Sequence, residues 1–385
     1  MNNFIPYGKQ SIDDNDIESV ISVLKSDWLT TGPKVDEFEE KFAKYVNSKY
    51  AVAVSSGTAA LHAAAFAAGI SDGDEVITTP MTFAASANCV LYQNGKPMFS
   101  DIDKKTYNID PTKIEEKITN KTKAIIPVDY TGQPCEIDII NEITEKKDLV
   151  VIEDASHAVG AKYKGKKLGS FSDLSVFSFH PVKHITTGEG GMITTNSEEM
   201  YEKLLLFRNH GITKNKDKFF SKNDGGWFYE QQYLGYNYRI TDLQCALGIS
   251  QLKKLDDFIK KRKEIVKKYN DAFENIDEII PPYQLEYAES SWHLYVIQLD
   301  LSKLKAKRKK IFNILRKNNL GVQVHYIPVY YHPYYQKLGF KKGICPNAEE
   351  IYKKIISIPL YPKMTDDDID RVIEVILKTI KKQRR

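Results

Sequence analysis

Short apolar runs alternate with amphipathic stretches along the first half of the chain. Strands buried on both faces read as continuous apolar runs, and helices show apolar residues three and four positions apart. The runs predict strands at residues 50–54, 75–79, 97–101, 124–128, 149–154, 174–179 and 192–195. Strands that alternate with helices in this way predict an α/β fold, in which helices cover both faces of a mainly parallel sheet.

Three segments show a clear helical period. Residues 11–26 place Ile17, Val20, Ile21 and Leu24 on one face, with Ser11 as a candidate N-cap. The Gly-Pro pair at 32–33 then breaks the pattern before a second helix, which is predicted to bury Val35, Phe38, Phe42 and Tyr45. A long helix is predicted from Thr241 to Tyr269, where leucines recur at helical spacing.

The pattern restarts after Pro281-Pro282. Residues 291–298 and 321–326 are predicted to form strands, and the basic stretch 305–318 between them is predicted to form a helix. A chain of 385 residues is long for a single core. We therefore predict a large domain over residues 1–250 and a smaller C-terminal α+β domain over residues 251–385.

Composition narrows the class of protein. Hydrophobic residues make up 42% and charged residues 28% of the chain, which is typical of a globular protein. A net charge of +4 is too small to suggest nucleic acid as a partner, and the basic end Lys-Lys-Gln-Arg-Arg is interpreted as a solvated helix end. No apolar run reaches the length of a membrane span, and the first residues do not resemble a signal peptide. We expect a cytoplasmic protein without a membrane partner.

The four cysteines are far apart and form no Cys-x-x-Cys pair. This spacing signals neither a metal site nor a disulfide framework. Buried free thiols are the expected state of Cys89, Cys135, Cys245 and Cys345.

The segment 177–191, Phe-Ser-Phe-His-Pro-Val-Lys-His-Ile-Thr-Thr-Gly-Glu-Gly-Gly, has the features of a turn that holds a reactive lysine. Pro181 stiffens the approach to Lys183, and the glycines after it give the backbone freedom. A catalytic amine must be held at fixed geometry and must lose its proton readily, which partial burial can achieve. Lys183 is therefore the candidate catalytic residue.

Two other segments fit a phosphate-bearing cofactor. Strand 50–54, the turn Ser55-Ser56-Gly57-Thr58 and the alanine-rich helix that follows make an anion site, because free N–H groups and the helix dipole point at the turn. The apolar run 149–154 meets carboxylates only at its carboxyl end, where parallel sheets bind ligands. Glu153 and Asp154 are both candidates there.

These segments together resemble the nucleotide-sugar aminotransferases of the DegT family, which are fold-type-I pyridoxal phosphate (PLP) enzymes. The resemblance extends over nearly the whole chain and is greatest to the C4 aminotransferases of pseudaminic acid biosynthesis. It implies a mainly parallel seven-stranded sheet in the large domain. A dehydratase branch of the family replaces the lysine by histidine, whereas here His184 follows Lys183. The resemblance therefore implies an aminotransferase.

The resemblance also assigns roles to residues. The cofactor PLP is expected to be held by Gly57, Thr58, Phe83, Asp154, His157, Ser178, Lys183 and Asn237. Among these, the pattern Glu-Asp-x-x-His selects Asp154 over Glu153 for the pyridine nitrogen, and Asn237 reaches the phosphate of the neighbouring subunit. The substrate is expected to contact Tyr7, Asp27, Trp28, Leu29, Thr30, Gln323, Val324, His325 and Tyr326. No residue is expected to bind a metal.

The implied activity is amino transfer from glutamate to C4 of a UDP-linked 4-keto-6-deoxy-N-acetylhexosamine, by a homodimer with shared active sites. Another UDP- or dTDP-linked keto sugar is an alternative substrate. A lyase of the cysteine desulfurase type lacks its cysteine nucleophile, and a silent regulatory protein would be expected to lose Lys183 or Asp154. No Gly-x-Gly-x-x-Gly opens a helix, which argues against a Rossmann dehydrogenase.

Overall fold

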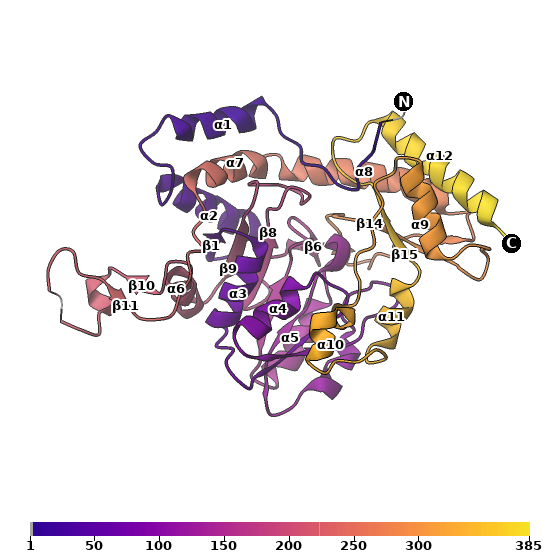
Figure 1. The fold of residues 1–385 in the computed structure, drawn as a ribbon. Helices are drawn as coiled ribbons and strands as arrows, with labels where there is room; N and C mark the ends of the chain where they lie inside the picture. The colour runs from indigo at the N-terminus through magenta and orange to yellow at the C-terminus, as the bar shows by residue number, and fades with distance from the viewer. Residues whose placement is uncertain (1–2, 223) are drawn as a thin grey trace.

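The computed structural model describes residues 3–222 and 224–385. Its centre is a seven-stranded sheet in the order β1-β9-β8-β5-β4-β2-β3 (Figure 1). Strand β9 runs antiparallel to its neighbours β1 and β8, and the other neighbouring pairs are parallel. The strands are β1 (Tyr50–Val54), β2 (Glu75–Thr78), β3 (Lys96–Phe99), β4 (Thr122–Ile126), β5 (Val150–Asp154), β8 (Leu174–Ser178) and β9 (Gly191–Thr195). The expected mainly parallel sheet is confirmed.

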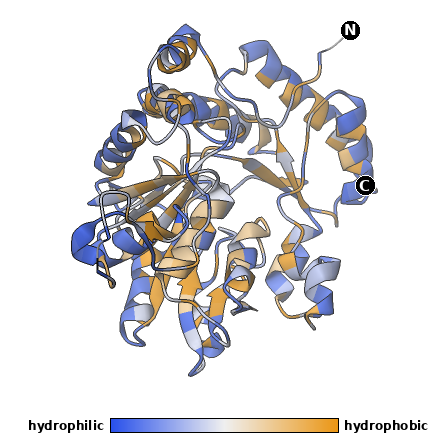
Figure 2. Cartoon of the chain, turned by 60° about the vertical axis from the view of Figure 1, so that its left-hand side comes forward, coloured by the Kyte–Doolittle hydropathy of each residue, from blue (hydrophilic) through white to orange (hydrophobic). Residues whose placement is uncertain are grey.

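Helices cover both faces of this sheet, and alternation along the strands decides what each face buries. On one face Ala51, Val151 and Phe177 share a core with α2 (Pro33–Val46), α5 (Ile137–Glu145) and α7 (Asp242–Leu252). On the other face Val52, Ile152 and Val176 share a core with α3 (Gly57–Ala67), α4 (Ala85–Tyr92) and α6 (Glu198–Phe207). Figure 2 shows the same division, with hydrophobic residues along the strands and hydrophilic residues on the outer sides of the helices.

The C-terminal part has its own core around a three-stranded sheet in the order β12-β14-β15. Its strands are β12 (Ile279–Ile280), β14 (Tyr295–Leu299) and β15 (Ile355–Ile358), and its helices are α9 (Arg308–Lys317), α10 (Pro333–Lys337), α11 (Pro346–Tyr352) and α12 (Asp366–Gln383). Helix α8 (Leu255–Phe273) connects it to the large sheet, as Figure 1 shows. A domain boundary at residue 250 remains a prediction.

Two small sheets complete the structure. Strands β13 (Ala288–Glu289), β6 (Lys162–Tyr163) and β7 (Lys166–Lys167) form one of them. Strands β10 (Ile212–Thr213) and β11 (Glu230–Gln231) form the base of an arm that projects from the body (Figure 1). We call residues 212–222 and 224–236 the arm.

The structure corrects several local predictions. Helix α1 (Asp14–Leu24) is capped by Asp13 and not by Ser11, because the Asp13 carboxylate accepts from the N–H of Asp16 in a capping box. The long helix 241–269 is two helices, α7 and α8, which meet at Lys253-Lys254. Segment 321–326 is not a strand, since only Gln323 pairs, with Ser357.

Other expectations about burial were met in part. The side chains of Val35, Phe38 and Phe42 are buried as predicted. All four cysteines are buried and free, as expected. Ile17, Ile21 and Leu24 on α1 are exposed, and the helix packs against α7 with Val23 buried instead. Among the described residues, no helix combines the length and apolar character needed to cross a bilayer.

Candidate active site

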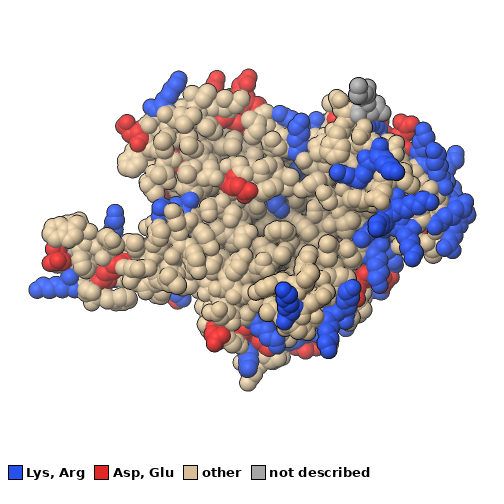
Figure 3. All heavy atoms as spheres, viewed as in Figure 1, with Lys and Arg blue, Asp and Glu red and all other residues tan. Residues whose placement is uncertain are grey.

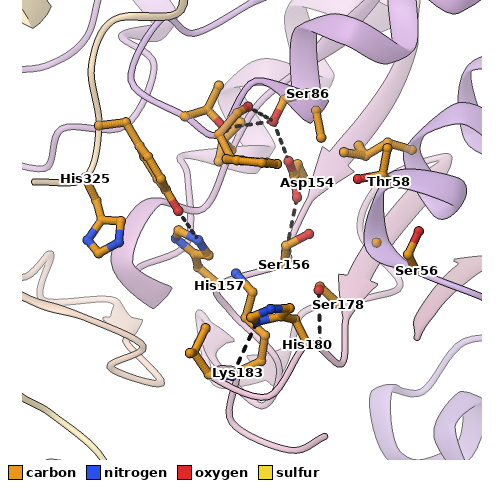
Figure 4. Close-up of a pocket in the computed structure, with 18 of the residues that line it drawn as sticks. Ser56, Thr58, Ser86, Asp154, Ser156, His157, Ser178, His180, Lys183 and His325 are labelled. Atoms are coloured by element: carbon orange, nitrogen blue, oxygen red, sulfur yellow. Dashed lines mark hydrogen bonds between the residues drawn. The ribbon is translucent and has the colours of Figure 1, made fainter. Parts of the chain in front are cut away.

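A cavity of about 410 Å³ opens at the carboxyl ends of β5 and β8, beside the start of α3. Figure 4 shows side chains from several segments of the chain around it, among them Thr58, Asp154 and Lys183. More than half of the predicted site residues line this one cavity: Tyr7, Gly57, Thr58, Phe83, Asp154, His157, Ser178, Lys183, His325 and Tyr326. The cavity therefore brings together residues that are spread over most of the chain.

Lys183 stands in a turn that returns the chain from β8 to β9. The turn is closed by Phe179, whose N–H donates to Gly190 O at 2.9 Å and whose carbonyl accepts from the N–H of Thr187 at 3.1 Å. Burial lowers the pKa of the Lys183 amine to about 8, although the Asp154 carboxylate opposes this change. A substantial fraction of the amine is therefore neutral near physiological pH, as a nucleophile requires.

The first turn of α3 forms an anion cup at the cavity wall. The Ser56 hydroxyl caps the helix by accepting from the N–H of Ala59 at 3.0 Å, and Gly57 and Thr58 are the first helical residues, whose N–H groups lack acceptors within the helix. A Cβ on Gly57 would lie 2.9 Å from Ser178 Cβ, so only glycine fits between α3 and β8. The free backbone N–H groups, the helix dipole and the hydroxyls of Thr58 and Ser178 together suit a phosphate group.

Asp154 is a buried carboxylate on the cavity side of β5. Its Oδ2 accepts from Ser86 Oγ at 2.6 Å and its Oδ1 accepts from the N–H of Ser156 at 3.2 Å. Glu153 points to the opposite face, where it accepts from Ser175 Oγ at 2.7 Å. Burial raises the pKa of Glu153, and nearby Asp129 has a pKa raised by burial and by Glu153. Strand alternation thus presents Asp154, and not Glu153, to the cavity.

His157, which follows β5, contacts the C-terminal part of the chain. Its Nε2 is hydrogen-bonded to the Tyr326 hydroxyl at 3.0 Å. Burial, and to a smaller degree the Lys183 amine, hold its pKa far below the ordinary value, so the imidazole is neutral. Tyr326, predicted as a substrate contact, therefore also positions His157.

Tyr7 and His325 form the outer wall on the C-terminal side. Their rings lie 5.3 Å apart, and His325 Nδ1 is 2.8 Å from Ser357 Oγ. Burial lowers the pKa of His325 to about 4, so this ring is also neutral at physiological pH. Phe83, which is 61% exposed, faces the cavity from the loop before α4.

The other predicted residues do not line this cavity. Trp28 and Leu29 are 53% and 48% exposed, and Asp27 is exposed beside them. Thr30 pairs with Thr241 through the backbone, and Asn237 is exposed and pairs with Asn209. Within the C-terminal segment, Gln323 is exposed and Val324 packs against a hydrophobic core. Within one chain these residues lie apart from Lys183.

Some cavity residues were absent from the predicted set. Ser86, Thr82, Ser156 and Ser56 all line it, as do His180 and Glu189. The hydroxyl-bearing residues follow the carboxyl ends of predicted strands, where parallel sheets bind ligands, but many turn residues share that position. Nothing in the sequence distinguishes them from ordinary turn and cap residues.

The residue set fits PLP in particular. The cup around Gly57 suits the phosphate, the Asp154 carboxylate suits a protonated ring nitrogen, and the Lys183 amine suits a carbonyl carbon. Among the described residues, no group of three or more His, Cys, Asp or Glu side chains is arranged to hold a metal ion.

Comparison with known proteins agrees with this geometry. Residues 10–377 match the DegT/DnrJ/EryC1/StrS aminotransferase family. The chain is 45% identical over 382 residues to the spore coat polysaccharide biosynthesis protein SpsC of Bacillus subtilis, covering 99% of this chain and 98% of that one. It is 41% identical over 384 residues to a UDP-4-amino-4,6-dideoxy-N-acetyl-beta-L-altrosamine transaminase of Campylobacter jejuni, covering 99% of both chains.

Solved structures give the same result. PseC of Helicobacter pylori, an aminotransferase involved in pseudaminic acid biosynthesis, superposes with a TM-score of 0.92 at 34% identity, covering 99% of this chain and 100% of that one. Solved sugar aminotransferases of this fold include one in its PLP form. The expected fold-type-I architecture and the PLP cofactor are thereby confirmed.

Proposed function

The chain belongs to the DegT/DnrJ/EryC1/StrS aminotransferase family, and from that premise we propose that it transfers an amino group from glutamate to C4 of a UDP-linked 4-keto-6-deoxy-N-acetylhexosamine. The enzyme is a PLP-dependent sugar aminotransferase. The observation that supports a catalytic protein is the convergence of Lys183, Asp154 and the Gly57 cup on one cavity. The transaminase relative at 41% identity supports this sugar class.

We assign three functions to the residues that hold the cofactor. Gly57, Thr58 and Ser178 would bind the phosphate, Asp154 would meet the ring nitrogen, and the Phe83 ring would pack on the pyridine; all five residues line the cavity. When bound, PLP supplies an electron-accepting ring that stabilises negative charge on the carbon from which a proton is removed.

Lys183 Nζ is the group that moves protons. With a pKa of about 8 its amine is close to the operating pH, where a single group can both accept a proton and return it. Neutral His157 and His325 add no positive charge that would compete for that proton. The same amine can therefore serve both halves of an amino transfer.

The remaining predicted residues are assigned to substrate and partner. Tyr7, His325 and Tyr326 line the cavity, which supports our proposal that they contact the sugar. We propose that Asp27, Trp28, Leu29, Thr30, Gln323 and Val324 extend this contact to the nucleotide. Asn237 is assigned to the cofactor phosphate of a second subunit in a cytoplasmic homodimer.

Product analysis tests the proposal. The holoenzyme is offered glutamate with a panel of UDP- and dTDP-linked 4-keto sugars, and aminated sugars are identified by mass spectrometry and NMR. We expect turnover of the UDP-linked 4-keto-6-deoxy-N-acetylhexosamine. If the enzyme preferred a different nucleotide or sugar, the proposed substrate would be wrong.

A different keto sugar is the second candidate. SpsC, named for spore coat polysaccharide biosynthesis, is 45% identical, which is more than the altrosamine transaminase. The same panel separates the two candidates, because it varies the nucleotide and the sugar independently. Absence of amination with every sugar, despite bound PLP, would instead favour a silent regulatory protein.

A further inference from the structure

A chain of buried hydroxyl groups ends on the Asp154 carboxylate. Thr82 Oγ1 lies 2.7 Å from Ser86 Oγ, and Ser86 Oγ lies 2.6 Å from Asp154 Oδ2. All three side chains are buried, and both hydroxyl residues line the cavity. Figure 4 shows Ser86 pointing at Asp154 from the wall opposite Lys183.

The donor direction in this chain follows from counting hydrogens. An ionised carboxylate only accepts, so the single hydroxyl hydrogen of Ser86 must point at Asp154. Ser86 then has no hydrogen left for Thr82, and the short Thr82–Ser86 contact requires Thr82 to donate. The Phe83 carbonyl, 3.3 Å from Ser86 Oγ, is then a nearby dipole and not the acceptor.

We propose that Ser86 and Thr82 are positioning residues for the cofactor, which hold the Asp154 carboxylate in the orientation that would meet the ring nitrogen. A charge-assisted hydrogen bond in a buried site favours the charged carboxylate and fixes its rotation. Thr82 strengthens the hydrogen bond from Ser86 to Asp154, because its own hydrogen bond to Ser86 polarises the Ser86 hydroxyl. The proposal rests on the assignment of Asp154 within the proposed function and is independent of which sugar is aminated.

The test compares PLP with an analogue in which carbon replaces the ring nitrogen. Only PLP can use the Asp154 charge, whereas both molecules use the phosphate cup. Dissociation constants of both are measured on the apoenzyme by fluorescence quenching. Ser86→Ala is expected to weaken PLP binding about tenfold, the effect of one charge-assisted hydrogen bond, and analogue binding by less than about twofold. Ser86→Thr, which keeps the hydroxyl, should bind PLP as the parent does.

Two further variants make the test decisive. Thr82→Val keeps the shape and removes the donor to Ser86, so about a threefold, PLP-specific loss is expected, smaller than the loss of a whole hydrogen bond. Thr78→Val is the matched control, because the buried Thr78 hydroxyl donates to Ile126 O and does not contact Asp154. It should change both affinities equally.

Coupling to Asp154 gives an independent readout. If Ser86 acts through Asp154, Ser86→Ala should cause no further loss of PLP affinity in an Asp154→Asn background. Equal weakening of PLP and analogue, or full additivity with Asp154→Asn, would overturn the proposal and make Ser86 a packing residue. These binding measurements use no sugar. Their result can therefore be interpreted even if the amination panel shows that the proposed substrate is wrong.

Discussion

The Lys183 cavity and the arm that precedes Asn237 differ in which side chains they bury and which they expose. In the cavity, polar groups are held by partners of the same chain, as Asp154 is by Ser86 and His157 is by Tyr326. On the arm, whose last residue directly precedes Asn237, large apolar side chains face outward instead. On the arm, Phe220, Trp227 and Leu234 are 85%, 76% and 78% exposed, and Figure 3 shows the arm standing clear of the body.

This difference indicates which parts of the predicted site one chain can complete alone. Exposed apolar side chains in such number mark an interaction surface. The exposed face of α1 with Ile17, Ile21 and Leu24 continues into Trp28 and Leu29, which belong to the predicted substrate segment. In the homodimer that we propose, a second copy of the chain would cover these residues, and Asn237 would reach the cavity of the neighbouring subunit.

The largest expected effect separates the two carboxylates of β5. Asp154→Asn removes the charge at the cavity and should slow turnover by roughly a hundredfold, as expected for an important electrostatic interaction. Glu153→Gln is the matched control, because Glu153 points to the other face and is hydrogen-bonded to Ser175. It should leave turnover nearly unchanged. Steady-state and single-turnover rates check this; equal losses in both variants would remove the distinction between the faces.

A smaller effect is expected at the surface. Asn237→Ala should weaken PLP binding by about tenfold, the typical effect of losing one hydrogen bond to a charged group. Mixing Asn237→Ala subunits with Lys183→Ala subunits should then restore activity, because a hybrid dimer contains one site with both residues intact.

The hybrid experiment decides whether the two regions belong to different subunits. Activity above the mean of the two parents is the expected result. No gain, once exchange of subunits has been demonstrated with labelled chains, would mean that Asn237 serves its own chain or has no role in the site.

The smallest expected effect is a change in pH dependence. The pKa of Lys183 is lowered from its ordinary value to about 8 by burial, so the neutral amine increases with pH and reaches its maximum a little above that value. The rate at which apoenzyme captures PLP should therefore rise from pH 7, reach half of its maximum near pH 8 and level off above about pH 9. A rate that keeps rising toward pH 10 would show that the capturing amine is an ordinary exposed lysine.

Much of the fold was predictable, because buried strands leave continuous apolar runs such as Val150–Ile152 and Ala51–Val54. Predictions of individual elements were less accurate where tertiary contacts decide which structure a segment adopts. Segment 321–326 alternates like a strand, yet only Gln323 pairs with the edge strand β15. The break between α7 and α8 has no Gly or Pro to announce it.

The site residues likewise fall into those that local sequence could identify and those that depend on tertiary contacts. Lys183, Gly57 and Asp154 could be selected because motif and strand end agree. Ser86 could not, because its role depends on α4 packing beside β5, which leaves no local signal. Residues such as Trp28 and Asn237 do not line the cavity of the single chain, and their roles stay predictions.

The central claim is that Lys183 is the amine that holds PLP. Borohydride reduction of the holoenzyme should fix the cofactor covalently to that amine, and peptide mapping by mass spectrometry should then place the label. The account predicts one labelled peptide, carrying the label on Lys183, and no label in Lys183→Ala, while Lys146→Ala, an exposed control, is labelled as the parent is. A label on any other lysine, or a label that persists in Lys183→Ala, would contradict it.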